Sequence, residues 1–318
     1  MTHPKARLIS LNSAPNAPFI VGERGLRWLR YMHFSKILHL PWERHASRNM
    51  VNYTRTKGIL NLSRAGKENE VLHYYRALYR VWGPQHWWPA ETQFEVVAGA
   101  YLTQNTAWTN VELALTNLHK EGVLSVEGIR RVSLRRLERL IRPSGYFRQK
   151  AARLKTFVRF LDENYGGSLD QLFEQPTAKL REELLSLNGV GPETADSIVL
   201  YAGNHPVFVV DAYTRRILDR HGILPQKTDY EEIRELFQRA LAPMVHQQQI
   251  TPAKAPLESG LRGAAHLPSA MSTAARTALV QVYNEMHGLI VGAGKNYCRK
   301  SQPLCDQCPL QPFLPCRK

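Results

Sequence analysis

Two glycines interrupt an apolar, helical stretch in the segment LNGVGPETADSIV, residues 187 to 199. Gly189 and Gly191 permit a positive φ and place no side chain over the neighbouring amides. Pro192 suits the first position of a helix, where its missing N–H group costs nothing. The unpaired N–H groups at the start of that helix would then form a site for a phosphate group. This spacing is equally typical of an ordinary helical hairpin.

All four cysteines of the chain lie within its last 21 residues. They are Cys298, Cys305, Cys308 and Cys316, separated by six, two and seven residues. Thiols crowded together in a reducing compartment favour metal ligation over disulfides. Four thiolates so placed can hold either zinc or an iron–sulfur cluster.

Helices must position these groups, because apolar residues recur at helical spacing from residue 68 onward. The clearest runs are residues 69–83, 94–104, 109–120 and 230–241. Breakers separate the runs at 83–84, 143–145 and 203–206, and alternating strand patterns are scarce. The sequence therefore predicts a mostly helical body.

Two segments depart from this pattern. Residues 1–66 hold eleven basic residues against two acidic ones, so this extension either tracks phosphates or is weakly ordered and kept solvated by its charge. Residues 243–275 are rich in proline and glycine and lack helical periodicity, which predicts a mobile surface insertion. A functional role for that insertion is the alternative.

The charge of the chain indicates its class of partner. Lysine and arginine outnumber acidic residues 42 to 27, a formal charge of +15, and nucleic acid is the leading polyanionic candidate. A merely solubilising surface is the alternative. The chain has no apolar run of about 18 residues and no apolar signal-peptide core near its start. We therefore expect a cytoplasmic protein, nucleoid-associated if bacterial, with no membrane partner.

The hairpin and the segment HPVFVVDAYTRRILDRHG that follows it resemble the helix-hairpin-helix DNA glycosylases of the endonuclease III superfamily. The superfamily motif is Leu-x-Gly-Val-Gly-x-x-Thr-Ala, then an apolar run and an aspartate. The matching positions are Leu187, Gly189, Val190, Gly191, Thr194, Ala195 and Asp211. The resemblance covers about residues 70 to 316. It implies an all-α fold of two domains, in which the turn and Thr194 contact DNA.

By the same resemblance, Asp211 is the catalytic carboxylate at the mouth of a cleft between the domains. Breaking the bond between a base and its deoxyribose builds positive charge on the sugar. A carboxylate beside the ring stabilises that transition state and can orient water. The alternative is that Asp211 only caps the helix that follows it.

Glu193 occupies the position at which bifunctional members carry a lysine. That lysine attacks the sugar and forms a Schiff base, which leads to strand nicking. A carboxylate cannot form an imine, so the resemblance implies a monofunctional glycosylase with weak or absent AP lyase activity. A nearby lysine could substitute for the missing one.

Three tryptophans lie among polar and breaker residues upstream of the hairpin. Although tryptophan is often simply core, this region resembles type III 3-methyladenine DNA glycosylase, in which a Trp-Pro pair and an aromatic after Thr-Gln-Asn-Thr line the base pocket. The matching positions are Trp88, Pro89 and Trp108, with Trp87 beside them. Electron-rich indoles stack well on cationic alkylated purines. Gln104 matches the glutamine that fills the gap left by the extruded nucleotide; a helix-end amide is the alternative.

The resemblance also bears on the cysteines. The first two intervals match the superfamily's 4Fe–4S loop, which favours that cluster over zinc, with a structural role. The last interval is two residues longer than in the superfamily, and the methyladenine branch includes members without a cluster. Basic residues between the ligands would lie near the DNA backbone.

We therefore predict an all-α, two-domain helix-hairpin-helix glycosylase with a C-terminal iron–sulfur cluster loop. The predicted divisions are a basic extension (1–66), a cluster domain (67–90 plus 203–318, with the insertion at 243–275 and the cluster loop at 298–316) and a helical barrel (91–202, with the hairpin at 181–202). We expect a monomer that removes an alkylated purine such as 3-methyladenine from double-stranded DNA. The alternatives are an endonuclease III-like enzyme for oxidised or mismatched pyrimidines and a non-catalytic DNA-binding module.

Overall fold

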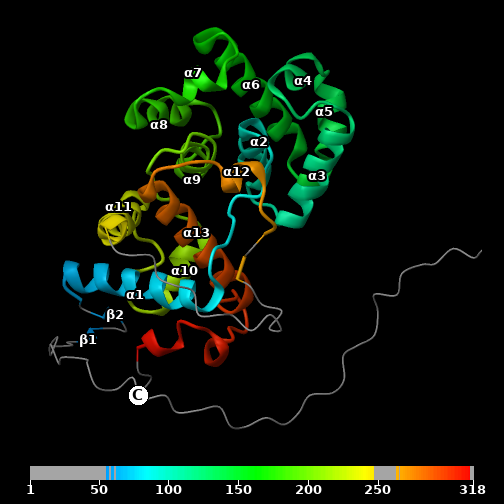
Figure 1. Ribbon diagram of the computed structural model, residues 1–318. Coiled ribbons are helices and arrows are strands. Elements are labelled where there is room, and N and C mark those ends of the chain that lie inside the picture. The colour runs from blue at the N-terminus through cyan, green and yellow to red at the C-terminus, as the bar shows by residue number, and fades with distance from the viewer. Residues whose placement is uncertain (1–54, 57–58, 61, 247–262, 265, 316–318) are drawn as a thin grey trace, which may run out of the picture. The chain divides into compact units, whose positions relative to one another are not determined.

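The computed structural model of the chain describes residues 55, 56, 59, 60, 62–246, 263, 264 and 266–315. Helices make up most of it, which confirms the predicted all-α class (Figure 1). The strands within these ranges are β1 (Arg55–Thr56) and β2 (Ile59–Leu60), a short antiparallel pair. Most of the predicted basic extension, residues 247–262 of the predicted insertion and Cys316 lie outside the described residues. A search of the described helices finds none with the length and apolar character needed to cross a bilayer.

One group of helices runs continuously from residue 93 to 202. Its members are α2 (Gln93–Thr103), α3 (Trp108–Lys120), α4 (Val126–Arg131), α5 (Leu134–Leu140), the 3-10 turn η1 (Arg142–Ser144), α6 (Phe147–Tyr165), α7 (Leu169–Phe173), α8 (Thr177–Ser186), α9 (Pro192–Ser197) and the π-helical turn η2 (Ile198–Ala202). The long helix α6 packs against α2, α4, α5 and α7, while α8 and α9 form the predicted hairpin. The first helix of that hairpin begins four residues before the predicted boundary.

A second group combines both ends of the described chain. Its members are α1 (Arg64–Trp82), α10 (Ala212–Arg220), α11 (Tyr230–Leu241), η3 (Ala242–His246), α12 (Ala270–Thr273), α13 (Ala278–Asn296), η4 (Cys305–Gln307) and η5 (Gln311–Phe313). The first helix, α1, packs against α11 and α13, far away in sequence (Figure 1). The division into a cluster domain and a barrel stays a prediction. What the structure shows is that helices from the two ends of the described chain pack together.

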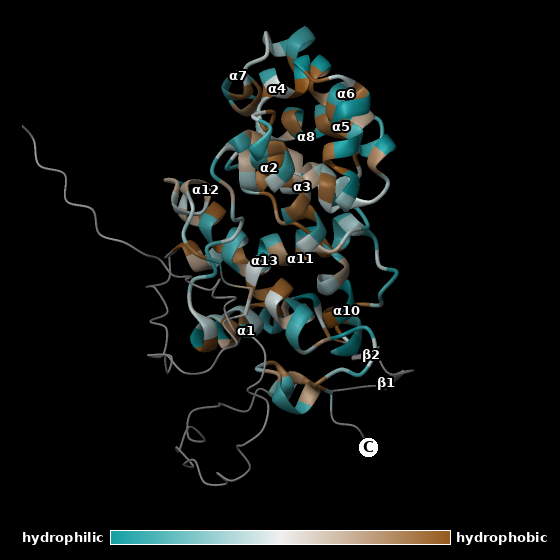
Figure 2. Ribbon diagram, turned by 90° about the vertical axis from the view of Figure 1, so that its right-hand side faces the viewer, coloured by the Kyte–Doolittle hydropathy of each residue, from teal (hydrophilic) through white to brown (hydrophobic). Residues whose placement is uncertain are grey.

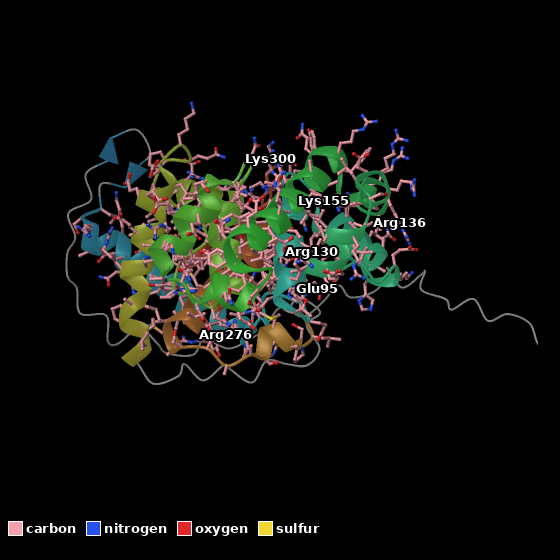
Figure 3. All side chains as sticks on the ribbon, turned by 90° about the horizontal axis from the view of Figure 1, so that it is seen from above. Glu95, Arg130, Arg136, Lys155, Arg276 and Lys300 are labelled. Atoms are coloured by element: carbon pink, nitrogen blue, oxygen red, sulfur yellow. The ribbon has the colours of Figure 1, made fainter. Side chains whose placement is uncertain are left out.

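Local sequence explains where α1 begins, ends and packs. The Ser63 hydroxyl accepts a hydrogen bond from the Gly66 amide at 3.2 Å and so caps the first turn. Val71, Tyr74 and Leu78 recur at helical spacing and are fully buried. Gly83 ends the helix with a φ of 66°. Hydrophobic and hydrophilic residues likewise interchange along the other helices (Figure 2), and charged side chains such as Arg136 project away from them (Figure 3).

Helix α13 is buried along most of its length and lies against residues of the predicted insertion. A Cβ on Gly292 would come within 2.6 Å of the Ala264 amide nitrogen, so only glycine allows this approach. The Ala264 amide donates to the Gln85 side chain at 2.8 Å, and the His266 amide donates to the Gln85 carbonyl at 3.1 Å. The described end of the segment predicted to be a mobile insertion is therefore packed and hydrogen-bonded, because α13 offers it a glycine surface.

Candidate active site

The glycine turn between α8 and α9 is open at Gly191, as the sequence predicts, but the Arg153 guanidinium covers Gly189, where a Cβ would collide with it. Gly189 has a φ of 80°, and a Cβ on Gly191 would meet no atom within 4 Å. The Val190 amide is engaged, since it donates to the Leu187 carbonyl at 3.0 Å. The Val190 amide is therefore not available to an anion, and the predicted phosphate site stays a prediction for Gly191 and the first turn of α9.

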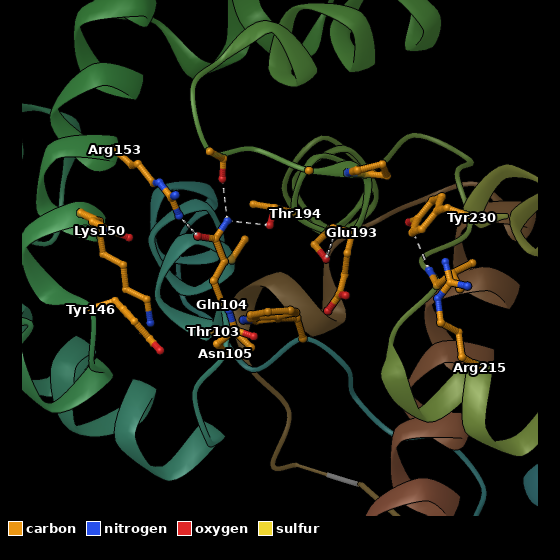
Figure 4. Close-up of a pocket in the computed structure, with 18 residues that line it drawn as sticks. Thr103, Gln104, Asn105, Tyr146, Lys150, Arg153, Glu193, Thr194, Arg215 and Tyr230 are labelled. Carbon is orange, nitrogen blue, oxygen red and sulfur yellow. Dashed lines mark hydrogen bonds between the residues drawn. The ribbon is translucent and has the colours of Figure 1, made fainter. Parts of the chain in front are cut away.

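Gln104 ends α2 and is tied to this turn by its side-chain amide. Its Nε2 donates to the Gly189 carbonyl and to the Thr194 hydroxyl, each at 3.0 Å. Its Oε1 accepts from the Arg153 guanidinium at 2.6 Å. All four residues line a cavity of about 670 Å³, which also reaches Gly191 (Figure 4). The structure therefore gathers the predicted gap-filling residue and the predicted phosphate turn in one cleft.

A second cavity, of about 650 Å³, shares Trp88 and Glu193 with the first. The rings of Trp88 and Trp108 meet edge to face in its wall, with centroids 5.1 Å apart. Trp87 adjoins Trp88 at 5.8 Å and also lines this cavity. Pro89 lines neither cavity, so the structure does not place it in the predicted pocket. The three indoles pack against one another in the wall of this cavity, and their exposed edges and faces suit contact with a flat, electron-poor ring.

Asp211 faces this second cavity from the start of α10 and is 8% exposed. Its Oδ1 accepts hydrogen bonds from the Thr214 amide at 2.7 Å and the Thr214 hydroxyl at 2.8 Å. Its Oδ2 lies 3.6 Å from Nε2 of His287. Burial alone would raise the pKa of Asp211, but His287 and Thr214 outweigh it and hold the pKa below its ordinary value. One oxygen caps the helix while the other is presented, ionised, to the cavity.

Glu193 stands on the rim between the two cavities, where its side chain remains exposed. Desolvation by the surrounding cleft and the negative charge of Asp211 raise its pKa to about 7, against a smaller opposing effect of Arg215. The two carboxyl groups of the site therefore differ in their affinity for protons. Asp211 stays ionised under conditions in which Glu193 begins to take up a proton.

Lys150 is the lysine that lines the first cavity. Its ammonium group is buried and donates to the Leu102 carbonyl, the Thr106 hydroxyl and the Ser144 carbonyl at 2.7 to 2.9 Å. Burial and nearby Arg153 lower its pKa to about 8. All three of its donor positions are used to join α2, η1 and α6.

Three residues of the site have no counterpart in the sequence-based prediction. His287 lies against Asp211, and His266 contacts Trp87 and Trp108, with ring centroids 5.3 and 6.5 Å away. Tyr146, which is 67% exposed, lines the first cavity at the start of α6. The one sequence signal that could have indicated His287 is the occurrence of a histidine within the apolar run of α13.

The described cysteines Cys298, Cys305 and Cys308 line one small space of about 20 Å³ beside α10. The Arg220 guanidinium donates to Sγ of Cys298 at 3.2 Å, and a cation beside this sulfur suits an anionic thiolate. Within the described ranges no group of three or more ligand side chains is already arranged around a metal position. The fourth predicted ligand, Cys316, lies outside these ranges, and the soft donors that are described fit an iron–sulfur cluster or zinc.

Comparison with known proteins defines the class. Residues 98–243 match the model of the HhH-GPD superfamily base excision DNA repair proteins. The chain is 41% identical over 251 residues to the "Putative DNA repair glycosylase" of Methanocaldococcus jannaschii, covering 78% of this chain and 98% of that protein. Endonuclease III of Thermotoga maritima is 28% identical over 219 residues, which cover 69% of this chain and 80% of the relative. The chain belongs to the HhH-GPD superfamily of base excision DNA repair proteins.

Solved structures agree with this membership. The H. pylori 3-methyladenine DNA glycosylase bound to 1,N6-ethenoadenine is 28% identical, with a TM-score of 0.57 and coverage of 72% of this chain and 97% of that one. A non-covalent endonuclease III–DNA complex, 20% identical, shares the fold at a TM-score of 0.57, with coverage of 78% and 94%. The predicted superfamily and fold class are confirmed, and the protein is a base excision repair DNA glycosylase whose partner is DNA.

Proposed function

We propose that the protein hydrolyses the N-glycosidic bond of an alkylated purine, such as 3-methyladenine, in double-stranded DNA. The observation that carries the proposal is the position of Asp211. Its carboxylate is ionised and faces a cavity walled by Trp88 and Trp108. The proposed enzyme acts as a monomer on one flipped nucleotide at a time.

In this mechanism the Gly191 backbone and the first turn of α9 hold a phosphate of the damaged strand. Gln104, fixed by the hairpin, fills the space that the flipped nucleotide leaves. The base enters the second cavity and stacks on the indoles in its wall, and its sugar then lies against Oδ2 of Asp211. As the glycosidic bond breaks, the carboxylate stabilises positive charge on the sugar and orients water toward C1′.

Cation–π attraction supports the choice of lesion. Alkylation at N3 or N7 makes a purine cationic and weakens its glycosidic bond, so tight stacking and a carboxylate suffice without a general acid. The likeness to a solved structure that is named as a 3-methyladenine DNA glycosylase supports the same choice of lesion. Arg299 and Lys300 line the second cavity, which contains Asp211, and both are exposed, which fits contacts to the DNA backbone around the flipped nucleotide.

Glu193 and Lys150 together support hydrolysis without strand cleavage. Glu193 offers no amine at the rim, and the amine of Lys150 is fully hydrogen-bonded inside the protein. A Schiff base needs a free, unprotonated amine that can reach C1′. Because neither Glu193 nor Lys150 supplies this amine, the abasic site is the expected product, and borohydride trapping with the parent protein tests Lys295 and Lys300, the lysines that line the cavity of Asp211.

The cysteines would hold a 4Fe–4S cluster, with Cys316 as fourth ligand to Cys298, Cys305 and Cys308. Bound there, the cluster supplies cross-links that fix the loop and takes no part in base release. The hydrogen bond from Arg220 to Sγ of Cys298 ties the loop to α10. Iron and sulfide analysis of the purified protein distinguishes the cluster from zinc.

A panel of duplexes, each with one defined lesion, tests the proposed specificity. We expect purified protein to release 3-methyladenine or 7-methylguanine faster than uracil, thymine from a mismatch, or an oxidised pyrimidine. Preferential release of a pyrimidine would contradict the proposed specificity and indicate an endonuclease III-like enzyme. Tight binding without release of any base would indicate a non-catalytic module.

A further inference from the structure

The two oxygens of Asp211 have different surroundings. Oδ1 already accepts two hydrogen bonds from Thr214, which fix it at the start of α10. Oδ2 accepts none that the structure records and faces His287 on α13 at 3.6 Å. That distance is longer than a hydrogen bond, as is common in catalytic pairs before substrate tightens them. The oxygen available for catalysis is thus the one beside His287.

His287 is itself held in place from behind. Its Nδ1 lies 2.5 Å from the hydroxyl of Tyr201, and both side chains are buried, at 4% and 2% exposed. The rings of Trp87 and Phe208 pack against the imidazole with centroids 6.1 and 6.3 Å away. Nε2 has no hydrogen-bond partner in the described residues, although it is buried. Such a buried group is costly unless binding or catalysis uses it.

Hydrogen-bond chemistry determines which ring nitrogen of His287 carries the hydrogen. If the Tyr201 hydroxyl donates to Nδ1, the ring hydrogen resides on Nε2. A bare Nε2 would instead point its lone pair at a carboxylate oxygen, which is repulsive. The arrangement therefore places an N–H group of His287 toward Oδ2.

We propose that His287 is a positioning residue of the glycosylase reaction, which holds Oδ2 of Asp211 toward the sugar while Tyr201 holds the imidazole. The inference rests on the proposed function, in which Asp211 acts on the sugar. His287 acts only through that carboxylate.

Electrostatics gives the inference a measurable consequence. Burial opposes ionisation of Asp211, and His287 is the largest of the influences that counter it, followed by Thr214. The other titratable groups coupled to this carboxylate are Glu193 on α9, Tyr201 on η2 and Tyr213 on α10. The remaining cations that line the cavity are Arg216, Lys295, Arg299 and Lys300. Loss of His287 leaves burial and Glu193 less opposed, so the pKa of Asp211 rises.

The test compares three variants with the parent. His287→Leu removes the donor, His287→Gln keeps an N–H group near the Nε2 position, and Tyr201→Phe removes the hydroxyl behind the ring. Base release is followed under single-turnover conditions on one alkylpurine duplex from acidic to neutral pH. The Kd for an uncleavable analogue is measured alongside.

For His287→Leu we expect base release at neutral pH to be at least about tenfold slower, with a Kd within about twofold of the parent value. The acidic limb of the pH–rate profile, where release slows as pH falls, should move to higher pH by about one unit. His287→Gln should recover most of the rate and return the limb toward the parent. Tyr201→Phe should fall between the two. A His287→Leu protein with an unmoved limb, or with a loss of rate matched by loss of binding, would overturn the inference.

An Asp211→Asn control separates this inference from the proposed function. Full base release by Asp211→Asn would overturn the proposed function itself. An inactive Asp211→Asn together with an unimpaired His287→Leu would overturn only the role of His287. If His287→Leu does not fold, His287→Gln and Tyr201→Phe are compared with the parent instead. A Tyr201→Phe protein with the same rate and the same acidic limb as the parent would contradict the proposed positioning of Asp211 by His287 and Tyr201.

Discussion

Nε2 of Gln104 lies 3.0 Å from the carbonyl oxygen of Gly189 and donates a hydrogen bond to it. The residue proposed to fill the gap in the DNA and the turn proposed to hold a phosphate are thereby one hydrogen-bonded unit. This arrangement sets the distance between phosphate and gap before DNA arrives. It reduces the ordering that binding would otherwise require.

Gln104→Ala should weaken binding to a lesion-containing duplex by about tenfold, because it removes two bonds to the hairpin, one to Arg153 and the gap-filling group. Fluorescence anisotropy at fixed salt measures the Kd. Gln149→Ala is the matched control, since Gln149 lines the same cavity and is exposed. Equal Kd values for the two variants would contradict a special role of Gln104.

Trp108 tests the cation–π basis of lesion choice. Trp108→Leu should slow release of a cationic base such as 7-methylguanine by about tenfold more than release of a neutral base, while Trp108→Phe keeps much of the preference. Trp108 is half-buried, so its replacement disturbs the core less than that of buried Trp88. Single-turnover rates on paired substrates give the ratio. An equal loss for cationic and neutral bases would mean that Trp108 serves only as packing.

Glu193→Lys should introduce the amine that the rim lacks. We expect the variant to form a borohydride-trappable covalent complex with abasic DNA and to nick the strand, with trapping at least about tenfold above the parent. Glu193→Gln, which removes the charge without adding an amine, should trap no more than the parent. Strong trapping by the parent would mean that a different lysine acts as nucleophile.

The pH dependence of stability tests the buried carboxyl group of Glu285 on α13. Burial raises its pKa to about 7 from an ordinary 4.5, despite hydrogen bonds from the Gln85 amide and Gln281. Between these values the native state binds a proton that the unfolded state does not. This group therefore makes the free energy of unfolding fall as pH rises through that window, by up to about 3 kcal/mol.

Glu285→Gln removes this titration. Urea unfolding of both proteins from pH 4.5 to 7 measures the effect, and the parent should lose stability relative to the variant as pH rises. Parallel profiles for the two proteins would show that Glu285 is not protonated in the native state.

Cys308→Ser should abolish the visible absorbance of an iron–sulfur cluster and reduce the iron content of the purified protein. The thermal midpoint should fall as well, because the cluster cross-links the loop that packs on α10. Iron content unchanged by this substitution, or zinc in its place in the parent, would contradict the proposed ligand set.

Sequence reasoning works well where one local pattern determines the outcome. The glycines of the hairpin, Pro192 and the helix cap at Asp211 are short-range features, and the structure has them as expected. Helical periodicity likewise predicts the elements that carry them. Trp88 precedes α2 and Trp108 begins α3, and the two meet because Trp88 packs along α2 beside Gly99, which leaves room for its ring.

Long-range pairing is what the sequence conceals. His287 reaches Asp211 from α13, and although a histidine in an apolar run is unusual, the sequence does not show that Asp211 is its partner. Pro89 belongs to the matching motif, yet it lines neither cavity. The Val190 amide donates to the Leu187 carbonyl within the turn, so it is not available to a phosphate, and the sequence does not indicate this hydrogen bond.

Release of 3-methyladenine from a duplex with one such lesion, compared between the parent and Asp211→Asn under single-turnover conditions, tests the central claim most directly. The substitution is nearly isosteric and keeps an oxygen to cap α10, so the fold should persist. We predict that the rate falls by at least about a hundredfold, with the Kd for the duplex little changed. An Asp211→Asn protein that releases the base as fast as the parent would contradict the account.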